Sequence, residues 1–363
     1  MEICDNSISN PLVSVRCFTY NQSAYIKDAL NGFVMQQTNF PFVVLVVDDA
    51  STDGEQEVIR KFMTEEFELS DASVAYEKET EFAYIQYAQH KTNKNCFMVA
   101  MFLKENHYSQ KKKKFPYLAE WRDGVKYEAI CEGDDYWIDP LKLQKQVDFM
   151  EAHPDYTMCC TNAVIQTSEG NEEWCRYPAD QTVPTEDVIT HGGLFVQTAT
   201  LLFRREVLIE ATDYPESAKK CHVGDFPLQI YAALKGKVYW FVDKTATYRY
   251  MGTNSWTSSF KKQYIGKKIR NMRSEIDMLK DMDLLSNRKY TNAFKRIQAK
   301  LIYYLFYDHH SDFKLIEENF QDVFPCFNKK QRTDLFFMKH HCMWLVWLRK
   351  HSNPRKWFRK RSG

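Results

Sequence analysis

Three carboxylates stand within four residues at Glu132, Asp134 and Asp135, directly after the apolar stretch Tyr127–Ile130. The apolar stretch predicts a strand that ends at the acidic residues. Such a density of negative charge at a strand end requires a compensating cation. Two carboxylates of this kind suit a hard divalent metal ion that also holds a diphosphate. The chemistry predicted for this stretch is therefore metal-assisted binding of a diphosphate.

The segments that would position these carboxylates alternate between strand and helix. A strand at 12–18, a helix at 21–37, a buried strand at 42–47 and a helix at 55–67 are predicted from their periodicity. The acidic pair Asp48 and Asp49 follows the second strand, and Asp139 with Pro140 begins another helix. This order is typical of a nucleotide-binding α/β domain.

The rest of the chain extends this pattern. Residues 70–95 are polar, and either they lengthen the preceding helix or they form an insertion. Further strands are predicted at 96–103, 127–131, 156–161, 198–203, 238–242 and 245–250, and further helices at 115–122, 224–234 and from residue 260 onward.

Size and composition narrow the classes of protein. The 363 residues allow one large α/β domain with an accessory part, and a hydrophobic fraction of 44% excludes disorder for most of the chain. The ten cysteines have no CxxC spacing, the N-terminus lacks a signal sequence, and no apolar run reaches the roughly 20 residues of a membrane span. We therefore expect a reduced, cytoplasmic protein.

Charge is unevenly distributed, although the formal net charge is only +1. The stretch from Lys339 to Gly363 holds eight Lys and Arg residues and no Asp or Glu, together with Trp344, Trp347 and Trp357. Cations beside tryptophans suit the anionic inner face of the plasma membrane, and the alternative is a packed helix with a solvated end. No recognition motif supports nucleic-acid binding.

The ordered motifs resemble glycosyltransferase family 2, whose members are inverting enzymes of GT-A fold that use nucleotide-sugar donors. The residues that carry the resemblance are Val13-Ser14-Val15, Tyr20-Asn21, Val46-Val47-Asp48-Asp49-Ala50-Ser51-Thr52-Asp53, Glu132-Gly133-Asp134-Asp135-Tyr136-Trp137 and Gly224-Asp225. Residues 132–150 look like the version found in bacterial capsule and lipopolysaccharide sugar transferases.

The resemblance implies a fold and a division of the chain. The fold is an α/β nucleotide-diphospho-sugar transferase fold with a mixed, mainly parallel sheet and a C-terminal helical extension. Residues 1–258 would form the catalytic domain, with a nucleotide-binding half at about 10–135 and an acceptor half at about 136–258. Residues 259–363 would form the helical extension with its basic aromatic tail.

The resemblance also implies which residues bind the donor. Asp49 is the stronger candidate for a nucleoside contact, and Asp134 is the predicted ligand of Mg²⁺ or Mn²⁺. Asn21 could equally cap a helix, and Asp53 fits turn and cap chemistry better than binding. Glu132 departs from the family, which usually has aspartate there. The predicted donor-binding residues are Thr19, Tyr20, Asn21, Asp48, Asp49, Ser51, Glu132, Gly133 and Asp135.

On the acceptor side, the resemblance implies that Asp225 is the catalytic base, kept ionised by the helix N-terminus that it begins. A simple helix cap is the alternative for Asp225. Weaker acceptor-side candidates are Thr198, Thr200, His222, Gly224 and Trp256.

Together these features predict a metal-dependent, inverting enzyme that moves one sugar from a UDP-sugar to a hydroxyl of a surface glycan or lipid-linked acceptor. The chain lacks the Gln-x-x-Arg-Trp sequence of processive synthases, which favours single addition. Two alternatives remain: a degenerate sugar-nucleotide-binding or membrane-associated scaffold protein, and a nucleotidyltransferase. The second would need a glycine-rich basic loop that residues 13–20 lack.

Overall fold

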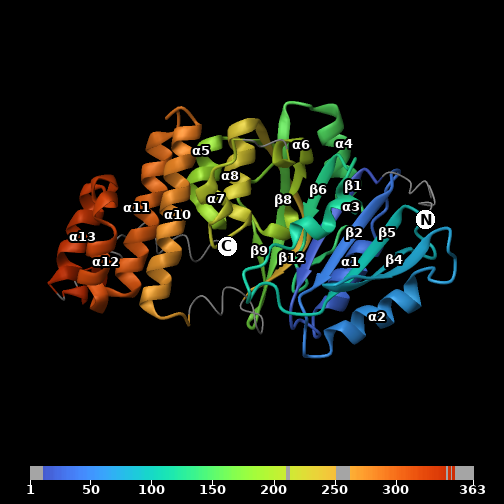
Figure 1. Cartoon of the computed structure of the whole chain (residues 1–363). Coiled ribbons are helices and arrows are strands. Elements are labelled where there is room, and N and C mark those ends of the chain that lie inside the picture. Colours follow the sequence, from blue (N-terminus) through green and yellow to red (C-terminus); the bar gives the residue numbers. More distant parts are fainter. Residues whose placement is uncertain (1–10, 210–212, 251–261, 341, 345, 348–363) are drawn as a thin grey trace. The chain divides into compact units, whose positions relative to one another are not determined.

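Long apolar runs become the central strands of one sheet in the computed structural model, which describes residues 11–209, 213–250, 262–340, 342–344 and 346–347 (Figure 1). The strands run in the order β10-β12-β8-β11-β6-β1-β2-β5-β4-β3, with β7 paired to β12 and β9 to β8. Their bounds are β1 (Val13–Thr19), β2 (Phe42–Asp48), β3 (Ala75–Glu79), β4 (Ala83–Gln89), β5 (Cys96–Leu103), β6 (Tyr127–Ile130), β7 (Tyr136–Trp137), β8 (Tyr156–Thr167), β9 (Gly170–Trp174), β10 (Gln181–Val183), β11 (Leu202–Arg204) and β12 (Lys237–Arg249).

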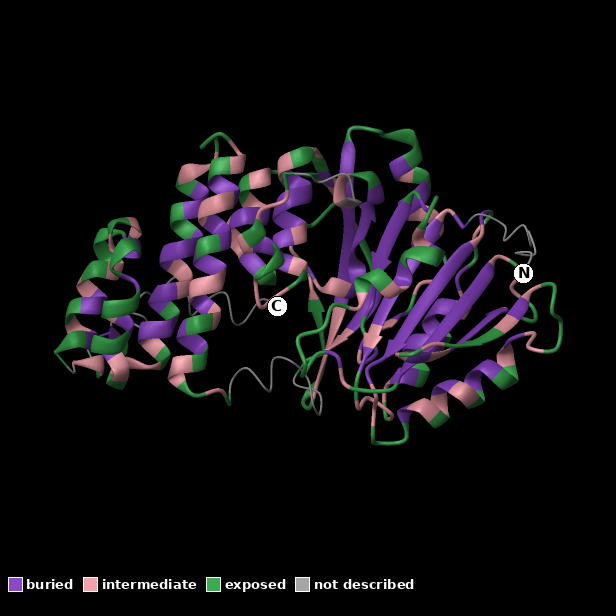
Figure 2. Cartoon of the chain, in the orientation of Figure 1, coloured by how far each residue is buried: buried purple, intermediate pink, exposed green. Residues whose placement is uncertain are grey.

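The four neighbouring strands β6, β1, β2 and β5 are parallel. Every residue of β2 and β5 is buried, as the predicted buried strands require, and Figure 2 shows the centre of the sheet buried. Parallel strands end at the same edge of a sheet, so the loops after β1, β2 and β6 meet there.

Helices cover both faces of this sheet. On one face, Leu30 of α1, Phe62 of α2 and Val147 of α4 pack in the core cluster that contains Val15 of β1. On the other face, Trp121 of α3 packs in a second cluster with residues of β2, β4 and β5. The helices of this region are α1 (Ile26–Val34), α2 (Glu55–Glu66), α3 (Ala119–Arg122), α4 (Lys142–Ala152) and α6 (Arg205–Ile209).

The chain divides into two compact units, and the second is helical. The first unit comprises residues 1–185, 193–212 and 232–261, and the second comprises 186–192, 213–231 and 262–363. The predicted boundary at residue 258 lies outside the described residues and stays a prediction. The remaining helices are α5 (Thr185–His191), α7 (Glu216–Lys219), α8 (Asp225–Lys235), α10 (Ile265–Leu285), α11 (Thr291–Asp308), α12 (Phe313–Asn319) and α13 (Lys329–Lys339).

Three predicted elements differ from the structure. Residues 70–95, which we expected to be a helix extension or an insertion, contain the antiparallel hairpin β3–β4, which extends the sheet and stacks the rings of Tyr76 and Tyr87. Residues 198–203 begin as the 3₁₀ turn Thr198–Thr200 before β11. The two strands predicted at 238–250 are one strand, β12, whose irregular pairing with β8 at residues 241–246 interrupts the apolar alternation.

A buried ion cluster stabilises β6. The Glu128 carboxylate is 1% exposed, accepts a hydrogen bond of 3.1 Å from Arg122 Nε, and lies 3.7 Å from Arg16 Nε.

Glu128→Gln leaves both guanidinium groups without their buried counter-charge, so we expect the free energy of unfolding to fall by roughly 3–5 kcal/mol in urea titrations. Glu79→Gln, which breaks an exposed pair with Lys104, should leave the free energy of unfolding almost unchanged. Equal losses in the two variants would contradict this role of Glu128.

Candidate functional site

The ends of β1 and β2 lie side by side, because the strands pair in parallel with Thr19 opposite Asp48. On the other side of β1, Arg16 pairs with Ile130 of β6, and the Cys131 N–H donates to the Arg16 carbonyl at 3.0 Å. The acidic stretch 132–135 therefore follows β6 at the edge where β1 and β2 end. The structure brings together the three segments that the sequence predicted for a donor site.

Glu55, which no sequence motif marks as a site residue, connects the first two of these segments. Its fully buried carboxylate accepts hydrogen bonds from the Gln22 N–H at 2.9 Å, from Ser51 Oγ at 2.8 Å and from Thr19 Oγ1. Burial raises the pKa of Glu55. Its place in the first turn of α2 resembles an ordinary helix-start acid, so only its contacts reveal that it shapes the site.

Only one of the two carboxylate oxygens of Asp48 is hydrogen-bonded within the described part of the chain. Its Oδ1 accepts from the Ser51 N–H at 3.1 Å and from Gln56 Nε2 at 2.6 Å. Its Oδ2 is buried and has no hydrogen-bond partner within the part of the chain that the structure describes. Burial raises the pKa of Asp48. A buried acceptor in this state is suited to a donor group of a bound ligand.

Asp49 is held by the loop that follows β5. Its carboxylate accepts from the His107 N–H at 2.8 Å, the Tyr108 N–H at 3.0 Å and Lys114 Nζ at 2.9 Å. Lys114 is the last residue of the basic run Lys111–Lys114. Nucleoside contacts by Asp48 and by Asp49 both stay predictions.

The loop after β1 is pinned to the loop after β2. The Asn21 N–H donates to Ser51 Oγ at 2.9 Å, and the Thr52 N–H donates to Asn21 Oδ1 at 2.8 Å. Asp53 accepts from the N–H groups of Ser23 and Glu55, as turn chemistry predicts, while Gly54 is the N-cap residue of α2. Tyr20 is 42% exposed, so its ring remains available to a ligand.

Asp135 is buried, and Arg249 of β12 anchors it. Asp135 Oδ1 accepts from the Arg249 N–H at 2.9 Å, while Arg249 Nη1 donates to the Asp134 carbonyl at 2.8 Å. The same guanidinium contacts Asp28 and lies 4.4 Å from the ring centre of Tyr136. Arg249 was not predicted, because it lies more than a hundred residues from the acidic stretch.

The acidic stretch fits a cation. Burial raises the pKa of Asp135 well above its usual value, and the charges of Asp134 and Glu132 add to the rise. Burial also raises the pKa of Asp134, although Arg249 and Gln22 oppose that rise. No group of three or more His, Cys, Asp or Glu residues arranged for a metal exists among the described residues. A magnesium ion that also binds a diphosphate needs only one or two carboxylates, so the half-buried Asp134 satisfies this requirement.

Gly133 allows the acidic stretch to approach the end of β1. A Cβ atom there would lie 2.6 Å from Gln22 Oε1 and 2.8 Å from Thr19 Cβ. Gly133→Ala must displace both side chains, so we expect about 1–3 kcal/mol less unfolding free energy and weaker donor binding. Gly193→Ala, where no atom lies within 4 Å of the added Cβ, is the matched control for both measurements. Unchanged donor affinity in Gly133→Ala would show that this close approach is irrelevant to the site.

The acceptor-side candidates fall in both units. Thr200 is buried in the first unit, and its Oγ1 donates to the Gln197 carbonyl at 2.7 Å; Thr198 begins the same turn. In the second unit, Asp225 is the first residue of α8 and accepts from Gln229 Nε2 at 3.3 Å, with open space beside Gly224. Trp256 lies outside the described residues, and the acceptor roles stay predictions.

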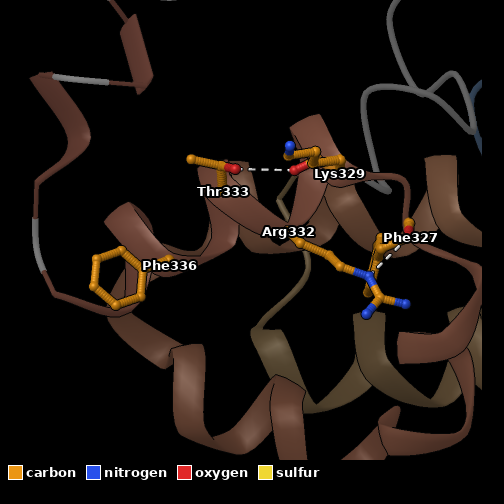
Figure 3. Close-up of a pocket in the computed structure, with 5 residues that line it drawn as sticks. All are labelled: Phe327, Lys329, Arg332, Thr333 and Phe336. Atoms are coloured by element: carbon orange, nitrogen blue, oxygen red, sulfur yellow. Dashed lines mark hydrogen bonds between the residues drawn. The ribbon is translucent and has the colours of Figure 1, made fainter.

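A separate hollow lies beside α13 in the second unit (Figure 3). Arg332, one of its lining residues, donates from Nε to the Phe327 carbonyl at 2.9 Å, and Thr333 Oγ1 donates to the Lys329 carbonyl at 2.9 Å. The lining residues are Phe327, Lys329, Arg332, Thr333 and Phe336. They include no carboxylate, so this hollow lacks the acid–base groups of the sheet edge.

Only the first part of the predicted basic tail is described, with Trp344 62% exposed and Trp347 53% exposed. Membrane contact through residues 339–363 and a cytoplasmic location stay predictions. Among the described residues, no helix is both long and apolar enough to cross a membrane.

Comparison with protein families and curated proteins gives two findings. Residues 14–81 match the model of glycosyl transferase family 2. The chain is also 26% identical over 250 residues to "Uncharacterized protein Rv1520" of Mycobacterium tuberculosis (strain ATCC 25618 / H37Rv) and to "Uncharacterized protein Mb1547" of Mycobacterium bovis. Each match covers 68% of this chain and 61% of the relative, so the chain spans about three fifths of the length of these curated relatives.

Comparison with solved structures concerns the fold. The chain resembles S. aureus TarS 1–349 in complex with UDP-GlcNAc at a TM-score of 0.57 and 17% identity, covering 91% of this chain and 88% of TarS 1–349. The complex of TarS 1–349 with UDP gives a TM-score of 0.57 at 16% identity, with 91% and 87% covered. These likenesses confirm the predicted α/β fold with its helical C-terminal region.

Proposed function

We propose, from the match of residues 14–81 to the model of glycosyl transferase family 2, that the protein is a metal-dependent, inverting sugar transferase. It takes one sugar from a nucleoside-diphosphate sugar, with UDP as the nucleotide, and adds it to a hydroxyl of a surface glycan or lipid-linked acceptor. The observation that carries the proposal is the edge where β1, β2 and β6 end. At this edge, one buried carboxylate oxygen of Asp48 has no hydrogen-bond partner within the described part of the chain, and Asp134 belongs to an acidic stretch that a cation would stabilise.

The donor is held by residues of the first unit. Asp48 Oδ2 accepts a hydrogen bond from the nucleoside, and the exposed ring of Tyr20 offers a surface for the base. Glu55 and Asn21 keep the two loops in place, so the site is formed before the donor arrives. Such preorganisation lowers the cost of binding.

Asp134 would hold a divalent cation, Mg²⁺ or Mn²⁺, against the diphosphate. When bound, the cation stabilises the negative charge that develops on the leaving diphosphate. Arg249 fixes the backbone of Asp134 and the side chain of Asp135, and so orients the acidic stretch toward the donor.

Transfer needs a base on the acceptor side, and Asp225 supplies it. Its carboxylate takes the proton of the acceptor hydroxyl as that oxygen bonds to the anomeric carbon. The bond between the anomeric carbon and the diphosphate breaks, and its electron pair leaves with the nucleoside diphosphate. Because attack and departure occur on opposite faces of the sugar, the anomeric configuration inverts.

A binding screen tests the donor class. Isothermal titration with UDP, GDP and CMP, each with and without Mn²⁺, should show saturable UDP binding that weakens when EDTA removes the metal. UDP-GlcNAc is the first sugar donor to add, since the structurally similar TarS 1–349 is in complex with it. Absence of metal-dependent binding for every nucleotide would refute the proposed function and favour a protein that has lost its donor site.

A further inference from the structure

A second carboxyl group, that of Glu275 in α10, lies near Asp225 in the second unit. Glu275 is 6% exposed, and its Oε1 lies 3.3 Å from His222 Nε2, three residues before Asp225. The other ring nitrogen of His222, Nδ1, lies 3.3 Å from Ser274 Oγ of the same helix. Helix α10, although later in the chain, therefore contacts the segment that precedes α8.

The environment of Glu275 opposes negative charge. Burial raises the pKa of Glu275 to about 8, and the charge of Asp225 adds to the rise. Burial lowers the pKa of His222 to about 4, so at neutral pH the imidazole brings no positive charge. Glu275 is buried and close enough to the half-buried Asp225 to feel its charge, so Glu275 is the carboxyl group that keeps its proton.

We propose that Glu275 is a positioning residue for Asp225: in its neutral form it holds a proton beside His222 and leaves Asp225 as the charged carboxylate that receives the acceptor proton. This role rests on the proposed function, in which Asp225 is the base. The division follows a common arrangement, in which two neighbouring acids take different roles because their surroundings separate their proton affinities. A buried carboxyl with such a neighbour is also more typical of a functional site than of a core.

Titratable groups that interact with Glu275 lie in the segment before α8 and in its first turn, and they include Asp225, His222 and Cys221. The charged residues of α7, which also packs against α10, pair with each other as Glu216 with Lys219. Elsewhere on α10, Arg273 pairs with Asp277 and Asp322, and Lys268 contacts His309. Loss of the Glu275 proton would therefore add a second negative charge beside Asp225.

Melting temperatures of the ligand-free protein, measured against pH, test the protonation state of Glu275. The pKa of Glu275 is higher in the folded chain than its unfolded value of 4.5, so folding takes up a proton and stability falls as pH rises from 4.5 to about 8. Glu275→Gln removes this proton uptake. Its melting temperature should exceed that of wild type by several degrees at neutral pH, and the difference should shrink toward pH 4.5. Glu318→Gln, at an exposed site on α12, should follow wild type at every pH. Parallel curves for Glu275→Gln and wild type would overturn the proposal.

Donor cleavage tests the positioning role. Wild-type turnover of a UDP-sugar should fall as pH rises through about 8, and Glu275→Gln should lose this alkaline fall. Glu275→Ala, which cannot hold a hydrogen bond, should lower kcat roughly 10–100-fold with the donor KM unchanged, and Glu275→Gln should restore most of that loss.

The outcomes separate this inference from the proposed function. An unchanged alkaline fall in Glu275→Gln would mean that Glu275 only packs, although the enzyme works. Absence of cleavage by wild type would instead overturn the function and this role with it, while the melting curves would still report where the proton lies.

Discussion

Asp134→Asn should lose metal-dependent donor binding, with the affinity for UDP in Mn²⁺ falling by about 100-fold or more. Even outer partners of metal ligands cost 10–100-fold when removed, so loss of the proposed direct ligand should reach or exceed that range. Asparagine keeps the size of the side chain but removes the charge that a divalent cation needs. Titration calorimetry in Mn²⁺ and in EDTA measures the effect.

The control for Asp134→Asn is Asp148→Asn, on the exposed side of α4 in the same unit. This variant should bind UDP as wild type does. Because burial raises the pKa of Asp134, removal of its charge should not destabilise the metal-free protein, and the melting temperature should be maintained or rise. Undiminished Mn²⁺-dependent affinity in Asp134→Asn would place the cation elsewhere.

Asp225→Asn should retain donor binding and lose turnover. A general base contributes roughly 10²–10⁴-fold, so kcat for UDP-sugar cleavage should fall within that range while the donor Kd stays constant. The base acts only on the attacking oxygen, which explains why donor binding is spared. Steady-state UDP release, together with UDP titration of the same variant, separates the two quantities.

Asp277→Asn serves as the control for Asp225→Asn, because Asp277 is half-exposed on α10 in the same unit. Its kcat should match that of wild type. Turnover of Asp225→Asn within a few-fold of wild type would leave Asp225 as a helix-capping residue only.

Local patterns predicted the centre of the sheet well. The continuous apolar residues of β2 and β5 are typical of strands buried on both faces, so these strands were predicted from local sequence. The acidic stretch and the pair Asp48–Asp49 were predicted to follow strands, and the parallel register brings them to one edge. The hairpin β3–β4 was not predicted, because the exposed residues of the edge strand β3 show no apolar alternation.

Contacts between residues that are far apart in the chain could not be predicted from the sequence. Arg249 contacts Asp134 and Asp135, although it is more than a hundred residues away in the sequence. Lys114 binds the Asp49 carboxylate from a loop that is sixty-five residues further along the chain. Glu55 and Glu275 looked like ordinary helical acids, and their roles depend on burial that a linear pattern does not encode. The choice of Asp49 over Asp48 rested on family position, whereas the unused oxygen of Asp48 became visible only in three dimensions.

Proton NMR of UDP-GlcNAc cleavage by the full chain in Mg²⁺ tests the central claim most directly. The account predicts metal-dependent release of UDP and, from this α-linked donor, a sugar product that appears first as the β-anomer. No release by wild type with any UDP-sugar in the presence of metal, or a product that appears first as the α-anomer, would contradict it.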